Sequence, residues 1–309
     1  MPNNNNHNLW RTFGLAIALA MAGYVADAAA AKVQRDPRPP VLSAKSQPDA
    51  TAPAPQLPKL TAEQIAERNA QARGGLKAWR AVQSLQMTGL LDAGGRTNAR
   101  LPFTLQMKRP HYQRVTIEFA GQTAVQVFDG QNGWKLRPFL NRNDTEPFSE
   151  EERTRLLHQD DLDGPLIDYA AKGSRIELDG TEMVESKANY RLKLTTRDGY
   201  TRRIWIDGTT FLESKMEGNP RRLDGKMRHV ENYVRDWHRV QGVMIPFVSE
   251  SHAETARLSP RMTVEKVMLN PQLADGLFAK PVAPAPSAGQ AKGVSAGSQA
   301  APTPPAHTS

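Results

Sequence analysis

Short stretches of alternating apolar and polar residues, separated by turns, fill the chain between Ser84 and Leu269. Asp-Gly pairs recur at 129–130, 163–164, 179–180, 198–199, 207–208, 224–225 and 275–276. Asp-Gly is typical of the tight type I′ turn of a β-hairpin, because both central residues of that turn need positive φ. A long antiparallel sheet with one apolar face has to curl, and its inner face then becomes a core or a cavity.

Within this region, apolar residues occupy every second position of the expected strands, which places each row on one face of a sheet. Later strands are expected at about 210–217, 228–237, 242–250 and 261–269. The rows of the earlier strands are Leu101, Phe103, Leu105 and Met107; Val115, Ile117 and Phe119; Val125 and Val127; Tyr190, Leu192 and Leu194; and Ile204 and Ile206.

Helices are expected at both ends of the sheet region and once inside it. Thr61–Gln64 has the spacing of a capping box, so a helix should begin there and stop at Gly74–Gly75. A short second helical piece should follow from Leu76 to Val82. A second capping box at Ser149–Glu152 predicts a helical insert of roughly twenty residues, and Leu273–Phe278 predicts a terminal helical turn.

The two ends of the chain have a different composition from the middle. Residues 1–31 have the pattern of a secretory signal peptide, with Arg11 before an apolar run from Phe13 to Ala26 and two A-x-A cleavage sites after it. An uncleaved membrane anchor is the alternative reading of this run. Residues 32–58 are rich in proline and residues 282–309 in alanine and proline, so both are expected to be disordered. The folded domain is therefore expected to span 59–281.

The chain contains no cysteine, and its formal net charge is +8. Without cysteine there are no disulfides, no thiolate nucleophile, no Cys-based metal site and no lipid-modified N-terminal cysteine. The charges are interspersed, and part of the positive excess lies in the Pro-rich segment. An exported protein with this charge pattern is not expected to bind nucleic acid, although weak attraction to an anionic membrane surface stays open.

The sequence carries no local catalytic signature. It has no G-x-S-x-G, no P-loop, no G-x-G-x-x-G, and its seven histidines form neither H-x-H nor H-E-x-x-H. Arg73–Gly75 fits a helix end better than a phosphate loop. Asp160–Gly164 lacks the alternating ligands of a calcium loop. We therefore expect neither an enzyme nor a metal or cofactor site, while paired carboxylates that meet only in space stay open.

Several segments resemble the exported outer-membrane lipoprotein-sorting family, which is related to the LolA/LolB-type carriers. The resemblance covers about 61–281. It rests on Ala72–Gly75 with Trp79, Lys108–Pro110, Gly121–Gly130 with Trp134, Asp163–Leu166, Gly242–Pro246, and Asn270–Pro271 with Leu277–Phe278.

This resemblance implies an α+β fold, namely an incomplete, half-open antiparallel β-barrel of about eleven strands with helices packed on its concave side. It implies an apolar cavity that receives lipoprotein acyl chains or phospholipid, and an arginine that bonds the lid backbone, for which Arg114, Arg191 and Arg202 are candidates. It also implies a periplasmic location, an inner-membrane exporter and an outer-membrane acceptor as partners, and we expect a monomer.

The function that follows is a periplasmic carrier for outer-membrane lipoprotein sorting. The expected cavity lining is Phe103, Leu105, Met107, Val115, Ile117, Phe119, Val125, Val127, Leu192, Leu194, Ile204 and Ile206. Two alternatives stay open: the same rows pack against the helices as a solid core, or the scaffold serves an envelope-stress sensor or regulator.

Overall fold

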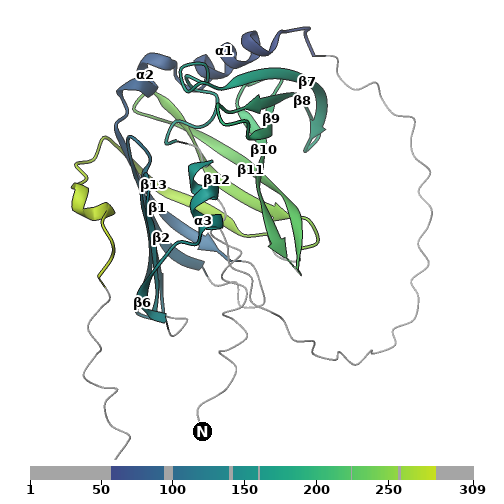
Figure 1. The fold of residues 1–309 in the computed structure, drawn as a ribbon. Helices are drawn as coiled ribbons and strands as arrows, with labels where there is room; N and C mark the ends of the chain where they lie inside the picture. The colour runs from purple at the N-terminus through teal and green to yellow at the C-terminus, as the bar shows by residue number, and fades with distance from the viewer. Residues whose placement is uncertain are drawn as a thin grey trace, which may run out of the picture.

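The computed structural model describes residues 57–93, 100–138, 142–158, 161–223, 225–256 and 259–282. The expected signal peptide 1–31 lies outside the described residues, as do nearly all of segments 32–58 and 282–309. Figure 1 shows one strongly curved sheet, with α1 across the top and α3 between its two halves.

The described residues form thirteen strands, two more than the eleven that the resemblance implied. One strand that the alternation pattern does not reveal is β6, whose sequence of Arg, Asn, Asp, Thr, Glu and Pro has no apolar row. The strands are β1 (Ser84–Asp92), β2 (Arg100–Lys108), β3 (Tyr112–Phe119), β4 (Gln122–Asp129), β5 (Gly133–Arg137), β6 (Arg142–Pro147), β7 (Arg175–Val184), β8 (Lys187–Thr195), β9 (Thr201–Asp207), β10 (Glu213–Leu223), β11 (Lys226–Val240), β12 (Val243–Ala253) and β13 (Arg261–Leu269).

All thirteen strands belong to one antiparallel sheet, in the order β6-β5-β4-β3-β2-β1-β13-β12-β11-β10-β9-β8-β7. Each strand lies beside its neighbour in sequence, except where β1 pairs with β13 and so joins two meanders. The edge strands β6 and β7 are not paired with each other, so the sheet is open. The curvature brings the two meanders to face each other (Figure 1).

The helices begin where the sequence predicts. Helix α1 (Ala62–Ala72) starts at a complete Thr61–Gln64 capping box, and α3 (Glu150–Leu157) starts at a complete Ser149–Glu152 box. Between them, α2 (Leu76–Ala81) follows Gly75. The terminal turn is a 3₁₀ helix, η4 (Asp275–Phe278). The side-chain caps of α1 and α3 satisfy backbone N–H groups at the helix start, which is why a four-residue pattern fixes these two boundaries.

The Asp-Gly pairs have more than one structural role. Those at 129–130, 198–199 and 207–208 lie at strand connections, and Asp207 accepts hydrogen bonds from the backbone N–H groups of Thr209 and Thr210. The pair at 179–180, by contrast, lies inside β7, where the pairing with β8 shifts register. Gly180 has φ +101° there, a conformation that glycine adopts freely. Asp-Gly therefore marks a positive glycine φ in hairpins and in a bulge, although Gly208 and Gly276 do not have one.

Strand register assigns every side chain to one of two faces. We call inner the face that carries Phe103, which pairs with Ile117, and Leu192, which pairs with Ile204. We call outer the face that carries Arg191, which pairs with Trp205. Directly paired residues share a face and neighbours in sequence alternate, so the register can be followed from β6 to β7.

Candidate ligand-binding site

The inner face of the first meander carries an apolar cluster. Its buried members include Phe103, Val115 and Ile117, and the half-buried Leu105 and Phe119 pack against it. The remaining members are Leu91, Ala93, Leu101, Met262 and Val264, with Met87, Phe247 and Val267 around them. Among the described residues, every member comes from β1, β2, β3, β12 or β13 or from the residue after β1. We call this set the inner apolar cluster.

The inner face of the second meander is covered by a helix. Leu192, Leu194, Ile204 and Ile206 are at most 1% exposed and pack with Ala62, Ile65 and Ala66 of α1. Leu166, from the segment between α3 and β7, closes the same cluster. These four expected cavity residues therefore form a helix-on-sheet core in this conformation, separate from the inner apolar cluster.

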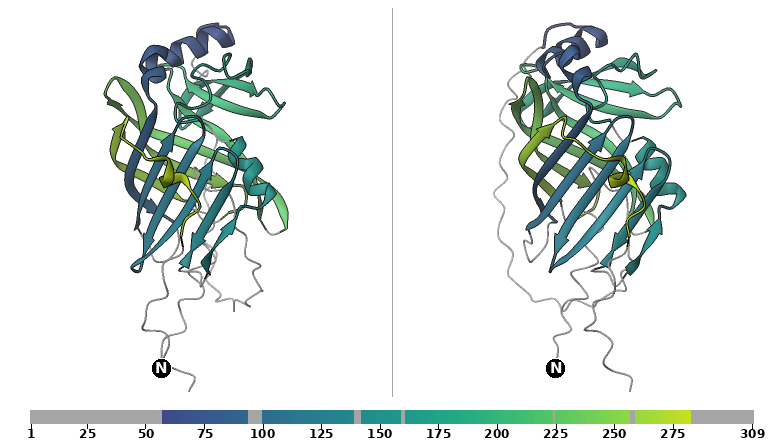
Figure 2. Two further views of the ribbon diagram at one scale, coloured as in Figure 1. Left: turned by 60° about the vertical axis from the view of Figure 1, so that its left-hand side comes forward. Right: turned by 90° about the vertical axis from the view of Figure 1, so that its left-hand side faces the viewer.

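Val125 and Val127 lie on the outer face. Thr116 pairs with Val125 and Val115 pairs with Gln126, so the β4 valines face away from Val115 and Ile117. They pack with Leu136 and with Phe278 of η4. The C-terminal segment crosses this side of the sheet (Figure 2) and covers the valines. Alternation along a strand cannot show which face of the sheet a row occupies, since that depends on register with the neighbouring strand.

Met107 lies beside a third cluster, built around the fully buried Trp79, which packs with Leu85 and Ile245. The indole N–H of Trp79 donates to the backbone oxygen of Arg73 at 3.0 Å. Trp134 is half-buried beside Phe278 on the outer face. Trp79 is therefore part of the core, and Trp134 does not lie at the inner apolar cluster.

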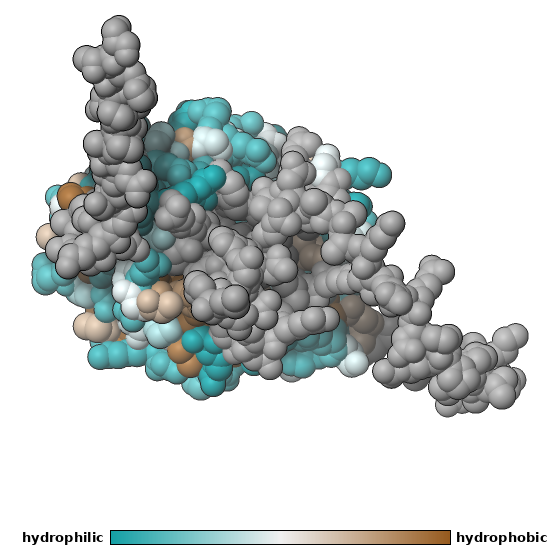
Figure 3. Space-filling model, turned by 90° about the horizontal axis from the view of Figure 1, so that it is seen from below, coloured by the Kyte–Doolittle hydropathy of each residue, from teal (hydrophilic) through white to brown (hydrophobic). Residues whose placement is uncertain are grey.

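A cavity of about 600 Å³ opens between α3, the segment 161–174 and the β8–β9 turn. It is lined by Leu157, His158, Pro165, Lys172, Leu194 and Arg202, among others. A smaller pocket beside it shares His111 and Asp161 and is lined by the inner-face residues Met107, Gln113 and Phe128. Seen from below (Figure 3), the described surface mixes hydrophilic areas with hydrophobic patches.

The segment 161–174 is fixed by a set of ion pairs. Asp163 is buried and lies 2.6 Å from both Arg109 Nη2 and Lys172 Nζ. Asp161 lies 2.6 Å from Nδ1 of His111. The hydrogen bond to Asp161 raises the pKa of His111 above its ordinary value. Because charged groups of the β2–β3 turn reach this segment, it is tied to the first meander.

Asp168 anchors the middle of the segment to α2. Its carboxylate lies 2.5 Å from Arg80 Nη2. The hydrogen bond from Arg80 lowers the pKa of Asp168. The segment is therefore held by acidic side chains at its start and at its middle.

Arg73 links four parts of the fold, a role that the sequence pattern did not indicate. It is the C-cap residue of α1, as the helix-end reading of Arg73–Gly75 predicted. Its side chain is 6% exposed; Nη1 lies 2.7 Å from Glu213, and Nε donates to the Met244 backbone oxygen at 3.2 Å. Nη2 also donates to the backbone oxygen of Asp163 at 3.4 Å. Only the fold brings these partners together.

The three arginines expected from the resemblance have other positions. Arg114 Nη1 donates to the Leu277 backbone oxygen at 3.1 Å, so it binds the C-terminal segment on the outer face. Arg191 lies in a polar network on the outer face, and Arg202 lines the cavity. Arg73, by contrast, bonds backbone oxygens of both the sheet and the segment 161–174.

Helix α3 is attached to the inner face by a buried ion pair. Lys135 pairs with Gln126, which is on the face of Val115, so its side chain points inward. Its Nζ lies 2.7 and 2.6 Å from the two carboxylate oxygens of Glu152. Since both side chains are about 5% exposed, the pair fixes the position of α3 over β5.

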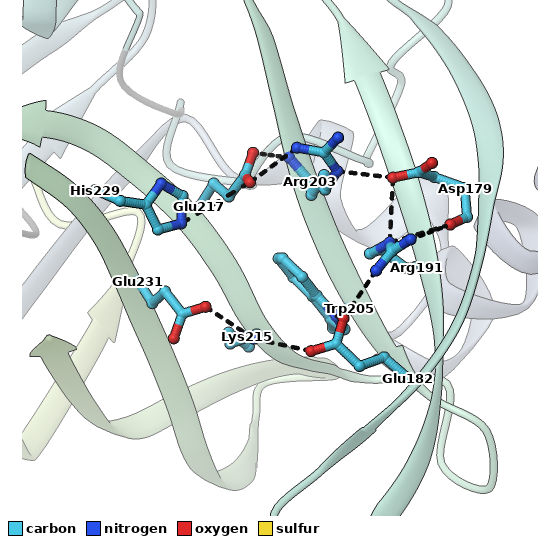
Figure 4. A network of polar contacts seen from close by, with 9 residues as sticks. All are labelled: Asp179, Glu182, Arg191, Arg203, Trp205, Lys215, Glu217, His229 and Glu231. Carbon is cyan, nitrogen blue, oxygen red and sulfur yellow. Dashed lines mark hydrogen bonds and ion pairs between the residues drawn. The ribbon is translucent and has the colours of Figure 1, made fainter. Parts of the chain in front are cut away.

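The outer face of the second meander carries a polar network (Figure 4). Lys215 is 7% exposed, lies 2.9 Å from Glu231, and its ammonium is 4.0 Å from the centre of the Trp205 ring. Arg203 bridges Asp179 and Glu217. Opposite charges on neighbouring strands stabilise pairing and leave this face hydrophilic.

No metal site and no membrane-spanning helix is found in the part of the chain that the structure describes. Its His, Asp and Glu residues form no group of three that could hold a metal ion. None of its helices is long and apolar enough to cross a membrane.

No protein-family model and no curated protein matches the sequence. Solved structures do match. A LolA superfamily protein from Nitrosomonas europaea has a TM-score of 0.50 at 16% identity, over 72% of this chain and 99% of that one. A DUF1329 family protein from Desulfovibrio piger has 0.49 at 12% identity, covering 71% and 97%. A protein from Vibrio parahaemolyticus described as an outer-membrane lipoprotein-sorting protein domain has 0.46 at 12%, covering 70% and 95%.

The first of these likenesses shows the fold. The described sheet and helices correspond to nearly the whole of the N. europaea structure. The resemblance to the LolA/LolB-type fold that the sequence motifs carried is thus confirmed at the level of the fold.

Proposed function

We propose that this chain is a periplasmic carrier that binds lipid, or the acyl chains of a lipoprotein, on its inner apolar cluster. The observation that carries the proposal is the contrast between two parts of the inner face. The inner face of β8 and β9 is covered by α1, whereas the inner apolar cluster, built from β1–β3, β12 and β13, contains, among the described residues, no helical residue. Phe103, Val115 and Ile117 are at most 3% exposed, so an acyl chain would insert among the side chains of this cluster and add a layer to it.

The expected strength of binding suits a carrier. Burying about ten methylene groups contributes roughly 8 kcal/mol before the costs of association, at about 0.8 kcal/mol each. That gross contribution corresponds to a dissociation constant on the order of micromolar. Cargo held at this strength can be released to an acceptor.

The helices and the segment 161–174 would act as the lid of this half-barrel, packed on its concave side. Arg73, Asp163 and Lys135 fix them to the sheet, so a bound chain would enter beside α3, where the 600 Å³ cavity opens. We propose a monomer that receives cargo from an inner-membrane exporter and passes it to an outer-membrane acceptor. The role that we propose for this chain is lipoprotein sorting, the role by which the V. parahaemolyticus domain is described.

Of the cavity residues expected from the sequence, only some form the proposed binding surface. They are Phe103, Leu105, Val115, Ile117 and Phe119, with Met107 at the margin. Val125 and Val127 are left out because they face outward. Leu192, Ile204 and Ile206 support α1 and would meet cargo only if α1 moved away, whereas Leu194 also lines the 600 Å³ cavity.

Two neighbouring residues allow a direct test. Phe119 is half-buried on the inner face, and Glu118 beside it is exposed on the outer face. A benzophenone amino acid placed at each position in exporting cells, followed by irradiation, should give an adduct containing acyl chains from position 119 and none from position 118. Equal capture at both positions, or no lipid adduct at either, would overturn the proposal.

A further inference from the structure

The tip of the β10–β11 hairpin extends beyond the strands on either side of it. On one side, β9 pairs with β10 only at Glu213, Lys215 and Met216. On the other, β12 pairs with β11 only from Val230 onward. Asn219 is still held, since its side chain accepts from the Tyr200 hydroxyl and donates to the Arg155 backbone oxygen. Beyond it, β10 and β11 pair only with each other as a two-stranded ribbon, seen at the lower right of Figure 1.

This ribbon is the most basic turn of the sheet. Residues 219–229 read NPRRLDGKMRH, with four Arg or Lys and one Asp, so the net charge of this turn is 4 − 1 = +3 with His229 neutral. The positive residues stand on both strands, at Arg221 and Arg222 of β10 and at Lys226 and Arg228 of β11.

An exposed apolar side chain lies among these charges. Met227 is 51% exposed, in a chain where most large apolar residues of the described strands are buried. It stands between Lys226 and Arg228 in the sequence, on the opposite face of the ribbon from both, so the cations lie beside it across the strand. An exposed apolar residue flanked by cations is the combination that partitions into the headgroup region of an anionic bilayer.

Acidic groups near the ribbon leave this charge largely in place. Glu217 is 16% exposed and is already bound by Arg203 at 3.2 Å. Glu254, in the β12–β13 turn, is exposed, and its backbone N–H donates to the His229 oxygen at 2.9 Å. Together with Asp224, these carboxylates are fewer than the cations on the ribbon.

We propose that the β10–β11 tip docks the protein on an anionic lipid bilayer, with Met227 at the level of the headgroups. Each Lys or Arg near such a surface strengthens binding about fivefold at low salt, and a buried methionine adds an apolar contribution. The tip shares no residue with the inner apolar cluster, so the docking proposal is independent of the cargo proposal.

The test is flotation with vesicles, using the chain as recovered after export. Wild-type protein should float with vesicles that contain phosphatidylglycerol and stay behind with pure phosphatidylcholine vesicles. The double variant Lys226→Glu/Met227→Ser should bind the anionic vesicles on the order of tenfold more weakly. Lys226→Arg should bind as wild type. At about 1 M salt, where the screening length falls to about 3 Å, wild-type binding should be lost.

The β7–β8 turn provides a matched control. Met183 is 45% exposed there, close to Lys187 but also to the acidic Glu182 and Glu185. The variant Lys187→Glu/Met183→Ser makes the same chemical changes and should alter vesicle binding less than about twofold, because the turn is not basic. Equal losses in both double variants, or equal wild-type binding to neutral and anionic vesicles, would overturn the proposal, as would no binding at all.

The cargo and docking proposals fail separately. If flotation is lost in the tip variant while position 119 still captures lipid, docking is supported and cargo binding is unaffected. If flotation is independent of the tip while position 119 captures lipid, the docking proposal alone is wrong.

Discussion

The guanidinium of Arg73 and the carboxylate of Glu213 lie 2.7 Å apart, with side chains 6% and 2% exposed. Arg73 ends α1 and Glu213 begins β10, 140 residues later. The same guanidinium donates to Met244 of β12 and Asp163 of the segment over the sheet. One side chain therefore joins the helical layer to the second meander.

Removing the Glu213 carboxylate should lower the free energy of unfolding. In Glu213→Leu the Arg73 charge stays buried without its partner, and breaking a buried pair this way typically costs about 3–5 kcal/mol. Urea unfolding measures the loss. Glu150→Gln breaks the exposed pair with Arg153 and should cost less than about 1 kcal/mol. Similar small effects of both variants would contradict the structural role of Arg73.

Because the β4 valines lie on the outer face, we expect that a change to their packing lowers the stability of the fold without weakening lipid binding. Phe278 is 1% exposed and packs on Val125 and Val127 from outside the sheet. Phe278→Ala should therefore destabilise the fold by about 3–5 kcal/mol. Lipid capture at position 119 should persist under conditions where the variant is folded. Loss of capture in the folded variant would mean that the two faces are coupled.

Capping boxes and alternation were sufficient to predict much of this fold. Thr61–Gln64 and Ser149–Glu152 fixed two helix starts because their hydrogen bonds are local. Alternation located the apolar strands but missed β6, which has no apolar row. It also grouped Val125 with Val115, because face depends on register between strands. The contacts of Arg73 with the sheet join residues 140 or more positions apart in the sequence, so no local sequence pattern indicates them.

Two leucines on the inner face should respond differently to truncation. Leu192 is 0% exposed beneath α1, so Leu192→Ala should lower stability by about 2–5 kcal/mol and leave binding of a fluorescent fatty acid unchanged. Leu105 is half-buried in the inner apolar cluster, so Leu105→Ala should cost less stability and weaken fatty-acid binding severalfold. The reverse pattern would place the cargo under α1 instead.

His111 and Asp161 predict how pH acts on the segment 161–174. The Asp161 hydrogen bond raises the pKa of His111, so its stabilising contribution is complete below about pH 6.5 and is lost as pH rises through the folded-state pKa. Burial raises the pKa of Asp161, but the bond to His111 together with the charges of His111, Lys172 and Arg109 outweighs burial and lowers the pKa. The contribution of Asp161 is therefore present above about pH 4 and is lost as pH falls through its lowered pKa.

Hydrogen exchange of residues 161–174 across this range measures the effect. After correction for intrinsic rates, we expect slowest exchange between about pH 4 and 6.5 and faster exchange above it. In His111→Gln the rise at higher pH should disappear. A wild-type profile that does not change with pH would show that the pair does not hold this segment.

The most direct test of the central claim is native mass spectrometry of the protein purified from the periplasm without detergent, combined with lipid extraction. The account predicts a discrete added mass that matches phospholipid or lipoprotein acyl chains, and its loss in a Leu105→Asp variant that still folds. A clean mass of the unliganded chain, together with no uptake of a hydrophobic dye, would contradict it and show that the inner apolar cluster is a closed core.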